Sequence, residues 1–221
     1  MRLADSFTAM VAKPILLRCQ AYGDHSVIRK KITVLQAARF FAVALSVGAI
    51  ATHSPKVAQA ALSQGTKAPD FTLEGALAGK PITFSLKAAL AKGPVVLYFF
   101  PAAFTTGCTQ EAHAFAAAAE QFQAAGATLV GITAGNTERV AEFSKVECRD
   151  KFAVLADPGA LTAILYHSVN TTHQTLLSQR TSYVIAPDGN ILFSFTSNNP
   201  EQHVTETLDS LNKWRESRIQ K

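Results

Sequence analysis

Two continuous apolar runs stand out in the globular part of the chain, with a helical pattern between them. Residues 94–100 (PVVLYFF) and 127–133 (ATLVGIT) carry no charge, as is typical of strands covered on both faces. Between them, apolar side chains recur at helical spacing, at Phe115, Ala118, Ala119 and Phe122. The pattern therefore predicts a central strand that stops at Pro101, a long helix that ends at Gly126, and a second buried strand.

Shorter elements flank this unit. Turn residues and apolar periodicity predict short strands over 71–73, 82–84 and 152–155, and short helices over 86–91 and 160–166. Another helix is expected to begin at 136–137, with its apolar side formed by Val140, Phe143 and Val146.

The last part of the chain predicts a hairpin and a closing helix. The turn at 186–189 (APDG) joins strands over 181–185 and 191–195. A helix over about 203–215 follows, with inward residues Val204, Leu208, Leu211 and Trp214. The order of strands and helices indicates the α/β class. A central mixed sheet with helices on both faces and a hairpin at one edge describes the thioredoxin-like fold, although other three-layer folds fit the pattern too.

Residues 1–60 differ from the rest in charge and in pattern. They carry eight Lys/Arg and two Asp/Glu, and a basic cluster at 29–31 precedes thirteen uncharged residues at 40–52 and an Ala-Gln-Ala ending at 58–60. This order is typical of a signal peptide, and the apolar stretch is short for a membrane span, which needs about 20 residues. We therefore expect a targeting segment over 1–60, a mature domain over 61–221, and a periplasmic or secreted location. The alternatives are a membrane anchor or an organellar transit peptide.

The charge of the remaining chain argues against nucleic acid as a partner. The protein's 21 Lys/Arg and 16 Asp/Glu give a net charge of +5, but residues 61–221 hold 21 − 8 = 13 basic and 16 − 2 = 14 acidic groups, a net of −1. Counterion-driven binding to DNA or RNA therefore has no support in the domain. Three cysteines are also too few for a disulfide-built scaffold.

The most informative residue is Cys108, in the segment 99–111 (FFPAAFTTGCTQE). It lies where a buried strand gives way to a helix, so it is expected in the first helical turn, near free backbone N–H groups and the positive end of the helix dipole. Both favour the thiolate, which is the nucleophilic form of cysteine. A small buried apolar cysteine is the plain alternative.

The surrounding motif resembles that of the peroxiredoxins, P-x-x-x-T-x-x-C, with Pro101, Thr105 and Cys108 at its three positions. Residues 180–185 (RTSYVI) resemble the family's R-x-T-F-V-I segment, and the likeness covers about 64–215. It is greatest to the peroxiredoxin Q or bacterioferritin-comigratory-protein group of the alkyl hydroperoxide reductase/thiol-specific antioxidant family. The resemblance implies a thiol-dependent peroxidase for antioxidant defence that reduces hydrogen peroxide or organic hydroperoxides and needs no metal or other cofactor.

The resemblance also implies a role for each matching residue. Cys108 would attack the peroxide and become a sulfenic acid, and Arg180 would supply positive charge to the thiolate and the peroxide. Thr105 would hydrogen-bond a peroxide oxygen, and Gly107 and Cys108 would offer backbone N–H groups. Pro101 would shield the sulfenic acid. Glu111 could hold Arg180 in orientation.

The chain departs from the group's pattern at one important position. Many members carry a second, resolving cysteine five residues after the first, and here that residue is His113. Cys148 is the remaining candidate, but on a helix that starts near Asn136 it would lie roughly 18 Å from the end near Cys108. A disulfide needs Cα atoms about 5.5–6 Å apart. A one-cysteine cycle is therefore favoured, in which an external thiol such as thioredoxin, glutaredoxin or a small thiol reduces the sulfenic acid.

Three other functions remain open at this point. A redox sensor would form the Cys108 sulfenic acid without turnover. A copper-binding protein on the same fold would use Cys108 and His113, although soft metals prefer two thiolates. A disulfide exchanger would need a cysteine where Thr105 stands. The sequence does not distinguish a monomer from a homodimer.

Overall fold

The structure is a computed structural model that describes residues 61–170 and 176–220. The targeting segment expected over 1–60 lies outside the described residues. Among these, a mixed seven-stranded sheet has the order β2-β1-β5-β4-β3-β8-β9. Its strands are β1 (Thr72–Leu77), β2 (Lys80–Ser85), β3 (Val95–Ala102), β4 (Thr128–Gly135), β5 (Ala153–Ala156), β8 (Thr181–Ile185) and β9 (Ile191–Thr196). The strands β6 (Val169–Asn170) and β7 (Leu177–Ser178), which the sequence did not predict, form a separate pair.

Strand β3 lies at the centre of the architecture. It pairs in parallel with β4 and antiparallel with β8, and β4 pairs in parallel with β5. Strands β1 and β9 continue the sheet on either side as antiparallel partners of β5 and β8. The mixed α/β fold with a thioredoxin-like sheet is confirmed.

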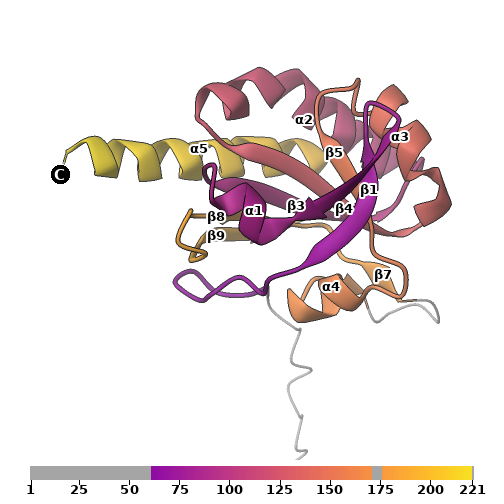
Figure 1. The fold of residues 1–221 in the computed structure, drawn as a ribbon, viewed down its shortest axis with the longest axis horizontal. Helices are drawn as coiled ribbons and strands as arrows, with labels where there is room; N and C mark the ends of the chain where they lie inside the picture. Colours follow the sequence, from indigo (N-terminus) through magenta and orange to yellow (C-terminus); the bar gives the residue numbers. More distant parts are fainter. Residues whose placement is uncertain (1–60, 171–175, 221) are drawn as a thin grey trace, which may run out of the picture. The chain divides into compact units, whose positions relative to one another are not determined.

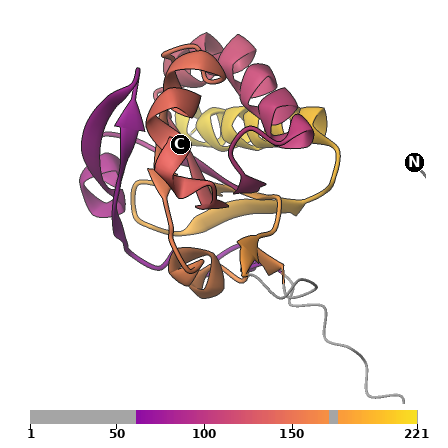
Figure 2. The ribbon, with the colours of Figure 1, turned by 90° about the vertical axis from the view of Figure 1, so that its right-hand side faces the viewer.

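Helices cover both faces of the sheet (Figure 1). Helices α2 (Thr106–Ala124), α3 (Val140–Val146) and α5 (Pro200–Ile219) pack on the face that carries Tyr98 and Phe100. Helices α1 (Leu86–Leu90) and α4 (Leu161–Leu165) pack on the opposite face. Figure 2 shows α2 and α5 together above the sheet and α4 below it. Side chains along β3 therefore alternate between two cores, and the strand is buried on both faces as its apolar run predicts.

The prediction that Pro101 stops the central strand is wrong. Pro101 is the second-last residue of β3. Pairing with β8 ends at Phe99, and the register with β4 passes from Phe100 to Ala102 without Pro101. A residue that has no N–H to donate is tolerated at this unpaired position near the strand end.

The predicted helix from Asn136 is also wrong in its bounds. A single 3₁₀ turn (Thr137–Arg139) comes first, and α3 spans only Val140–Val146. Arg149 and Asp150 have positive φ, so the chain turns away after the helix, and Cys148 lies in that turn. Val146, predicted to face the core, is more than half exposed. The estimate that placed Cys148 twelve residues along a continuous helix therefore does not apply.

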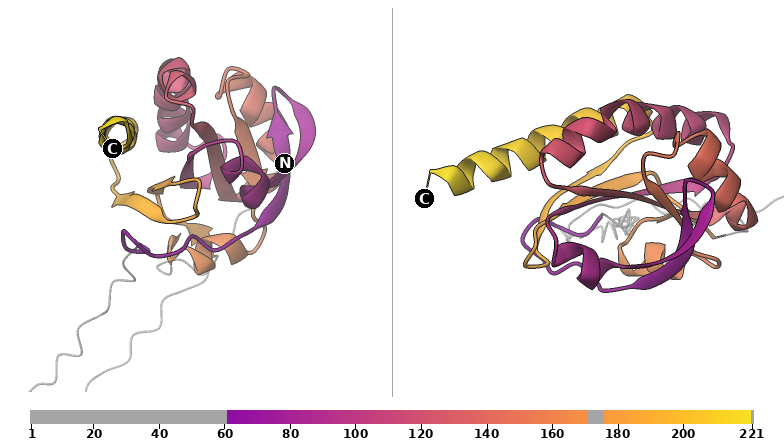
Figure 3. Two further views of the ribbon diagram at one scale, coloured as in Figure 1. Left: turned by 60° about the vertical axis from the view of Figure 1, so that its left-hand side comes forward. Right: turned by 45° about the horizontal axis from the view of Figure 1, so that its top comes forward.

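The closing helix is longer than predicted and begins earlier, at Pro200 after the cap Asn199. Figure 3 shows it extending past the end of the sheet beside α2. Its fully buried residues are His203, Thr207 and Leu211, whereas Val204, Leu208 and Trp214 pack against the core only in part. Of the helices that the structure describes, none is both long and apolar enough to cross a membrane.

Candidate active site

Cys108 lies in the first turn of α2, directly after the carboxyl end of β3. The connection is tight, because Phe104 adopts a left-handed backbone with φ of 64° just before Thr105, the residue at the N-cap position of α2. Two groups from the next βα unit hold this connection in place. Asn136 Nδ2 donates to the carbonyl of Ala103 at 2.7 Å, and the Arg139 guanidinium lies 3.7 Å from the centre of the Phe104 ring.

The Cys108 thiol faces an arginine from a neighbouring strand. The thiol is 1% exposed, and Arg180 Nη2 donates to its sulfur at 3.6 Å. Arg180 directly precedes β8, and because Thr181 pairs with Phe99 on β3, it lies beside the strand end from which α2 starts. Residues 72 positions apart thus meet because β3 and β8 are paired.

Gly107 gives Arg180 the space to reach the sulfur. A Cβ atom at position 107 would lie 3.0 Å from Arg180 Nη2, which is closer than ordinary van der Waals contact. The sequence pointed to Gly107 only for its backbone N–H. Its lack of a side chain is a second reason for glycine here.

Glu111 is one helical turn beyond Cys108 and fully buried. Its Oε2 accepts a hydrogen bond from Arg180 Nη1, so one guanidinium contacts the carboxylate and the thiol at once. Burial raises the pKa of Glu111 to about 8, and the charge of Arg180 opposes that rise. The other oxygen, Oε1, has no hydrogen-bond partner among the described residues.

Thr105 and Pro101 lie on the segment that leads into the helix. The Thr105 hydroxyl donates to the carbonyl of Ala102 at 3.1 Å and does not cap α2. Pro101 is half-buried, and its carbonyl accepts from Thr133 Oγ1 at 3.3 Å. The structure thus joins Cys108, Arg180 and Glu111 by hydrogen bonds, with Gly107 against the guanidinium, and leaves Pro101 and Thr105 just before the helix.

Cys148 is a second free thiol in the same hydrophobic cluster as Cys108. Its backbone N–H donates to the carbonyl of Phe143 at 3.1 Å. Burial raises the thiol's pKa well above its ordinary value, and the charge of Glu147 adds to the rise. Glu147 pairs with His113 Nε2 at 2.7 Å, so the residue at the usual resolving position contacts the turn that holds Cys148.

Three buried polar residues near the thiols were missed by sequence reasoning. The Tyr98 hydroxyl has no hydrogen-bond partner among the described residues, and its pKa is raised by burial and by the charges of Cys148, Glu111 and Cys108. His203 Nδ1 lies 3.9 Å from Glu111 Oε1 and hydrogen-bonds the Ser182 hydroxyl at 2.8 Å. The spacing of His203, Thr207 and Leu211 at i, i+4 and i+8 was the available signal that His203 lies on the core side of the last helix.

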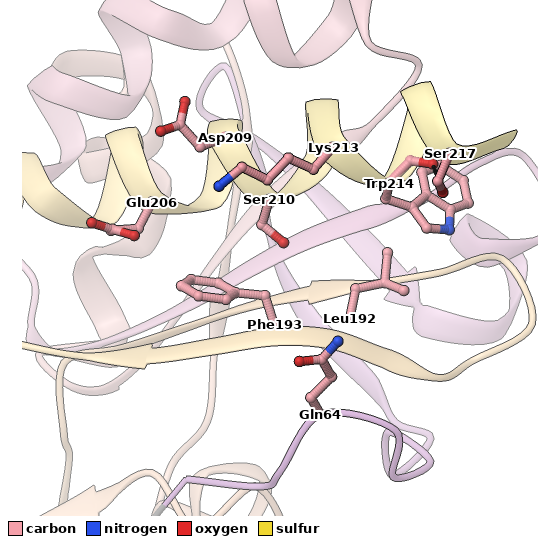
Figure 4. A pocket seen from close by; sticks show the side chains of 9 residues that line it. All are labelled: Gln64, Leu192, Phe193, Glu206, Asp209, Ser210, Lys213, Trp214 and Ser217. Atoms are coloured by element: carbon pink, nitrogen blue, oxygen red, sulfur yellow. Dashed lines mark hydrogen bonds between the residues drawn. The ribbon is translucent and has the colours of Figure 1, made fainter. Parts of the chain in front are cut away.

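A pocket of about 370 Å³ lies away from these residues, between α5 and β9 (Figure 4). Leu192 and Phe193 form its floor, and Asp209, Lys213 and Trp214 lie above them. Cys108 is not among its lining residues. Within residues 61–170 and 176–220, no group of three or more His, Cys, Asp or Glu side chains is placed to hold a metal ion.

Known proteins resemble this chain in sequence and in fold. The model of the AhpC/TSA family matches residues 64–194. "Peroxiredoxin Q, chloroplastic" from Sedum lineare is 34% identical over 154 residues, which cover 69% of this chain and 79% of that protein. The protein of the same name from Triticum aestivum is 35% identical over 149 residues, covering 66% and 65%. The crystal structure of peroxidoxin BcpB from Mycobacterium tuberculosis has a TM-score of 0.63 and 30% identity, covering 69% of this chain and 97% of that one.

Proposed function

The chain belongs to the AhpC/TSA family and is a thiol-dependent peroxidase, and from this premise we propose that Cys108 is the cysteine that attacks the peroxide. The contact between Arg180 Nη2 and the Cys108 sulfur at the start of α2 is the observation that carries the proposal. A guanidinium and a helix N-terminus both stabilise a thiolate, and the thiolate is the nucleophile. Cys148 instead follows the end of α3, and the charge that acts on its thiol is that of Glu147, which raises the pKa.

The reaction proceeds by displacement on oxygen. The thiolate sulfur forms a bond to the terminal hydroxyl oxygen of the peroxide while the O–O bond breaks. The sulfur becomes a sulfenic acid, and the departing hydroxide or alkoxide takes up one proton to leave as water or an alcohol. Arg180, already at the sulfur, stabilises the negative charge as it moves to the leaving oxygen.

Residues just before α2 and in its first turn bind the peroxide. Because Thr105 donates its own proton to the carbonyl of Ala102, lone pairs of Oγ1 remain free to accept the O–H of the peroxide. The backbone N–H of Gly107 points from the first turn of α2, where helical N–H groups lack intrahelical partners, and donates to a peroxide oxygen. Pro101, with no N–H of its own, shields the sulfenic acid from water.

We further propose that an external thiol completes the cycle. Both described cysteines are free, and the raised pKa of Cys148 makes its thiol a poor nucleophile near neutral pH. The sulfenic acid then forms a mixed disulfide with a thiol such as thioredoxin, glutaredoxin or a small thiol and releases water. A second thiol releases Cys108 and leaves as the oxidised disulfide.

Stopped-flow loss of peroxide, measured first without and then with dithiothreitol, tests both proposals. Cys108→Ser is expected to abolish peroxide reduction, and Cys148→Ser, the matched control, to retain most of the dithiothreitol-supported rate. A Cys108→Ser protein that still consumes peroxide would refute the assignment of the attacking cysteine. If Cys148→Ser instead reacts once and accumulates sulfenic acid, the one-cysteine cycle is wrong.

Residues 1–60 are proposed to be a targeting segment that is removed after the domain crosses a membrane. The charge and apolar order of the segment support this, and relatives named chloroplastic are organellar proteins. Mass spectrometry of the protein purified from its source is expected to find Ala61 at or near the N-terminus. Recovery of the intact 221-residue chain would contradict removal.

A further inference from the structure

Glu111 and His203 form a buried pair next to Arg180, and the role proposed for them rests on the proposed role of Cys108. Glu111 is fully buried, and within the described part of the chain only its Oε2 has a hydrogen-bond partner, Arg180. A buried carboxylate oxygen without a donor is costly, because water no longer solvates it. His203 Nδ1 lies 3.9 Å from Oε1.

Two hydrogen-bond partners, Ser197 and Ser182, hold the His203 ring beside Glu111. Its ring is fully buried, and Nε2 lies 2.9 Å from the carbonyl oxygen of Ser197. A carbonyl only accepts, so Nε2 carries the proton, and Nδ1 of the neutral ring is an acceptor for the Ser182 hydroxyl at 2.8 Å. The Phe195 ring packs edge-on against the imidazole at 5.0 Å and keeps this orientation.

We propose that His203 is a positioning residue for the peroxide step, which controls through the protonation of Glu111 whether Arg180 stays on the Cys108 sulfur. The Nδ1 lone pair has two alternative donors, the Ser182 hydroxyl and a protonated Glu111 Oε1. While Ser182 donates, Glu111 remains a carboxylate and anchors Arg180. When Glu111 takes up a proton and keeps it while donating a hydrogen bond to Nδ1, its negative charge is lost and Arg180 is released from its anchor.

The ionisable groups around this pair are consistent with such an exchange. Arg180 approaches from β8, Cys108 from α2, and Tyr98 from β3. Burial raises the pKa of Glu111 to about 8, and burial lowers the pKa of His203 to about 4. An added proton therefore stays on Glu111, and the neutral His203 ring can accept a hydrogen bond from the protonated carboxyl. Glu111 therefore changes its protonation state within the pH range in which enzymes ordinarily work.

Removing the donor and removing the acceptor of the Ser182–His203 hydrogen bond are expected to shift the pH dependence of the peroxide rate in opposite directions. Ser182→Ala frees Nδ1 for protonated Glu111, so the pH at which the peroxide step gains speed is expected to rise. His203→Phe removes the acceptor, and protonated Glu111 loses its partner. Because His203 is already fully buried, exchanging its ring for another buried ring changes hydration little. In His203→Phe, the pH at which the peroxide step gains speed is therefore expected to fall. We expect a shift of about half a pH unit or more in each variant.

The test is the pH dependence of the stopped-flow peroxide rate in the Cys148→Ser background. Glu111→Gln identifies the limb of the profile that belongs to Glu111, and thiolate absorbance follows the titration of Cys108 separately. Ser178→Ala, another buried serine, and His167→Asn, at an exposed histidine, are the matched controls and are expected to leave the limb in place.

Opposite shifts in the two variants would support the proposal. If the Glu111 limb of the pH–rate profile stays in place, or shifts in the same direction in both variants, the proposal is wrong. A merely structural role of His203 would lower the rate or the stability without opposite shifts. If His203→Phe fails to fold, the infrared band of the protonated carboxyl decides instead. Ser182→Ala must then strengthen the Glu111 band relative to wild type, and an unchanged band refutes the proposal. A wild-type protein without any Cys108-dependent peroxide rate would refute the proposed function rather than this inference.

Discussion

Cys108 and Cys148 are two buried, free thiols in one hydrophobic cluster, yet their electrostatic surroundings are opposite. Cys108 lies at the beginning of a helix with a guanidinium on its sulfur. Cys148 lies past the end of a helix, next to the carboxylate of Glu147. Burial alone therefore does not decide which cysteine reacts. The reactivity of each thiol also depends on the sign of the nearest charge and on which end of a helix the sulfur faces.

Helix α2 links the two surroundings. Its first turns carry Cys108 and Glu111, and the next turn carries His113, which pairs with the Glu147 that adjoins Cys148. The same helix thus presents its positive end to one thiol and connects to the anion beside the other. The comparison can be tested by changing the charge at either end.

Removing the Arg180 guanidinium is expected to have the largest effect on the difference in reactivity between Cys108 and Cys148. Arg180→Ala should slow the peroxide step by about 10²- to 10³-fold, the usual loss when a preorganised donor is removed from developing charge. Arg180→Lys should fall between, because a single ammonium group cannot contact both Glu111 and the sulfur as the fork does. Stopped-flow peroxide consumption measures both.

Arg218→Ala, at an exposed arginine on α5, is the control for the loss of one positive charge and should leave the rate unchanged. An Arg180→Ala enzyme with wild-type rate and an unmoved pH–rate profile would remove the basis for the contrast between the two thiols.

Crowding the guanidinium without removing it should have an intermediate effect. Gly107→Ala places a methyl group 3.0 Å from Arg180 Nη2, so the guanidinium must move by a few tenths of an ångström from the sulfur. We expect the peroxide rate to fall about three- to tenfold, since a small displacement of a catalytic donor is costly. Thr106→Ala, at the exposed neighbouring residue, is the control. Equal rates for the two variants would mean that the space at Gly107 does not matter.

The smallest effect is expected at the other thiol. Because the pKa of Cys148 is raised well above its usual value of 9.0, the thiolate fraction is small at neutral pH and increases only as the pH approaches that raised pKa. Alkylation of Cys148 in the Cys108→Ser protein should therefore rise with pH without a plateau up to about pH 9. Mass spectrometry of iodoacetamide-treated samples follows the labelling.

Glu147→Gln removes the negative charge and should speed the alkylation about two- to threefold. His113→Gln disrupts the same ion pair but leaves the carboxylate in place, so it separates charge from structure. A faster reaction in His113→Gln than in Glu147→Gln would show that local opening, and not charge, limits Cys148.

Much of the fold and the first contacts of the site could be predicted from sequence. The buried runs and the helical spacing between them led to β3, α2 and β4, because these patterns reflect burial directly. The meeting of Cys108 and Arg180 followed from a family motif and not from spacing, since residues 72 positions apart meet only through strand pairing.

The failures have physical causes. Pro101 signals a strand end in sequence, but the unpaired register position that tolerates it exists only in the assembled sheet. The end of α3 depends on positive φ at Arg149 and Asp150, two residues that often occur in ordinary helices. His203 was assigned no contact because its partners, Ser182, Ser197 and Glu111, come from other elements or from the loop before its helix.

Trp214 is the single tryptophan of the chain, so its fluorescence can be used to follow the closing helix. It packs partly against the core at the pocket between α5 and β9, eleven residues after His203, or roughly 16 Å along the helix axis. Its surroundings are the α5 residues of the pocket and Leu192 and Phe193 on β9, so its emission reports how α5 is seated on the sheet. A fluorescence transient upon mixing with oxidant would therefore signal that the whole helix shifts when the thiol is consumed.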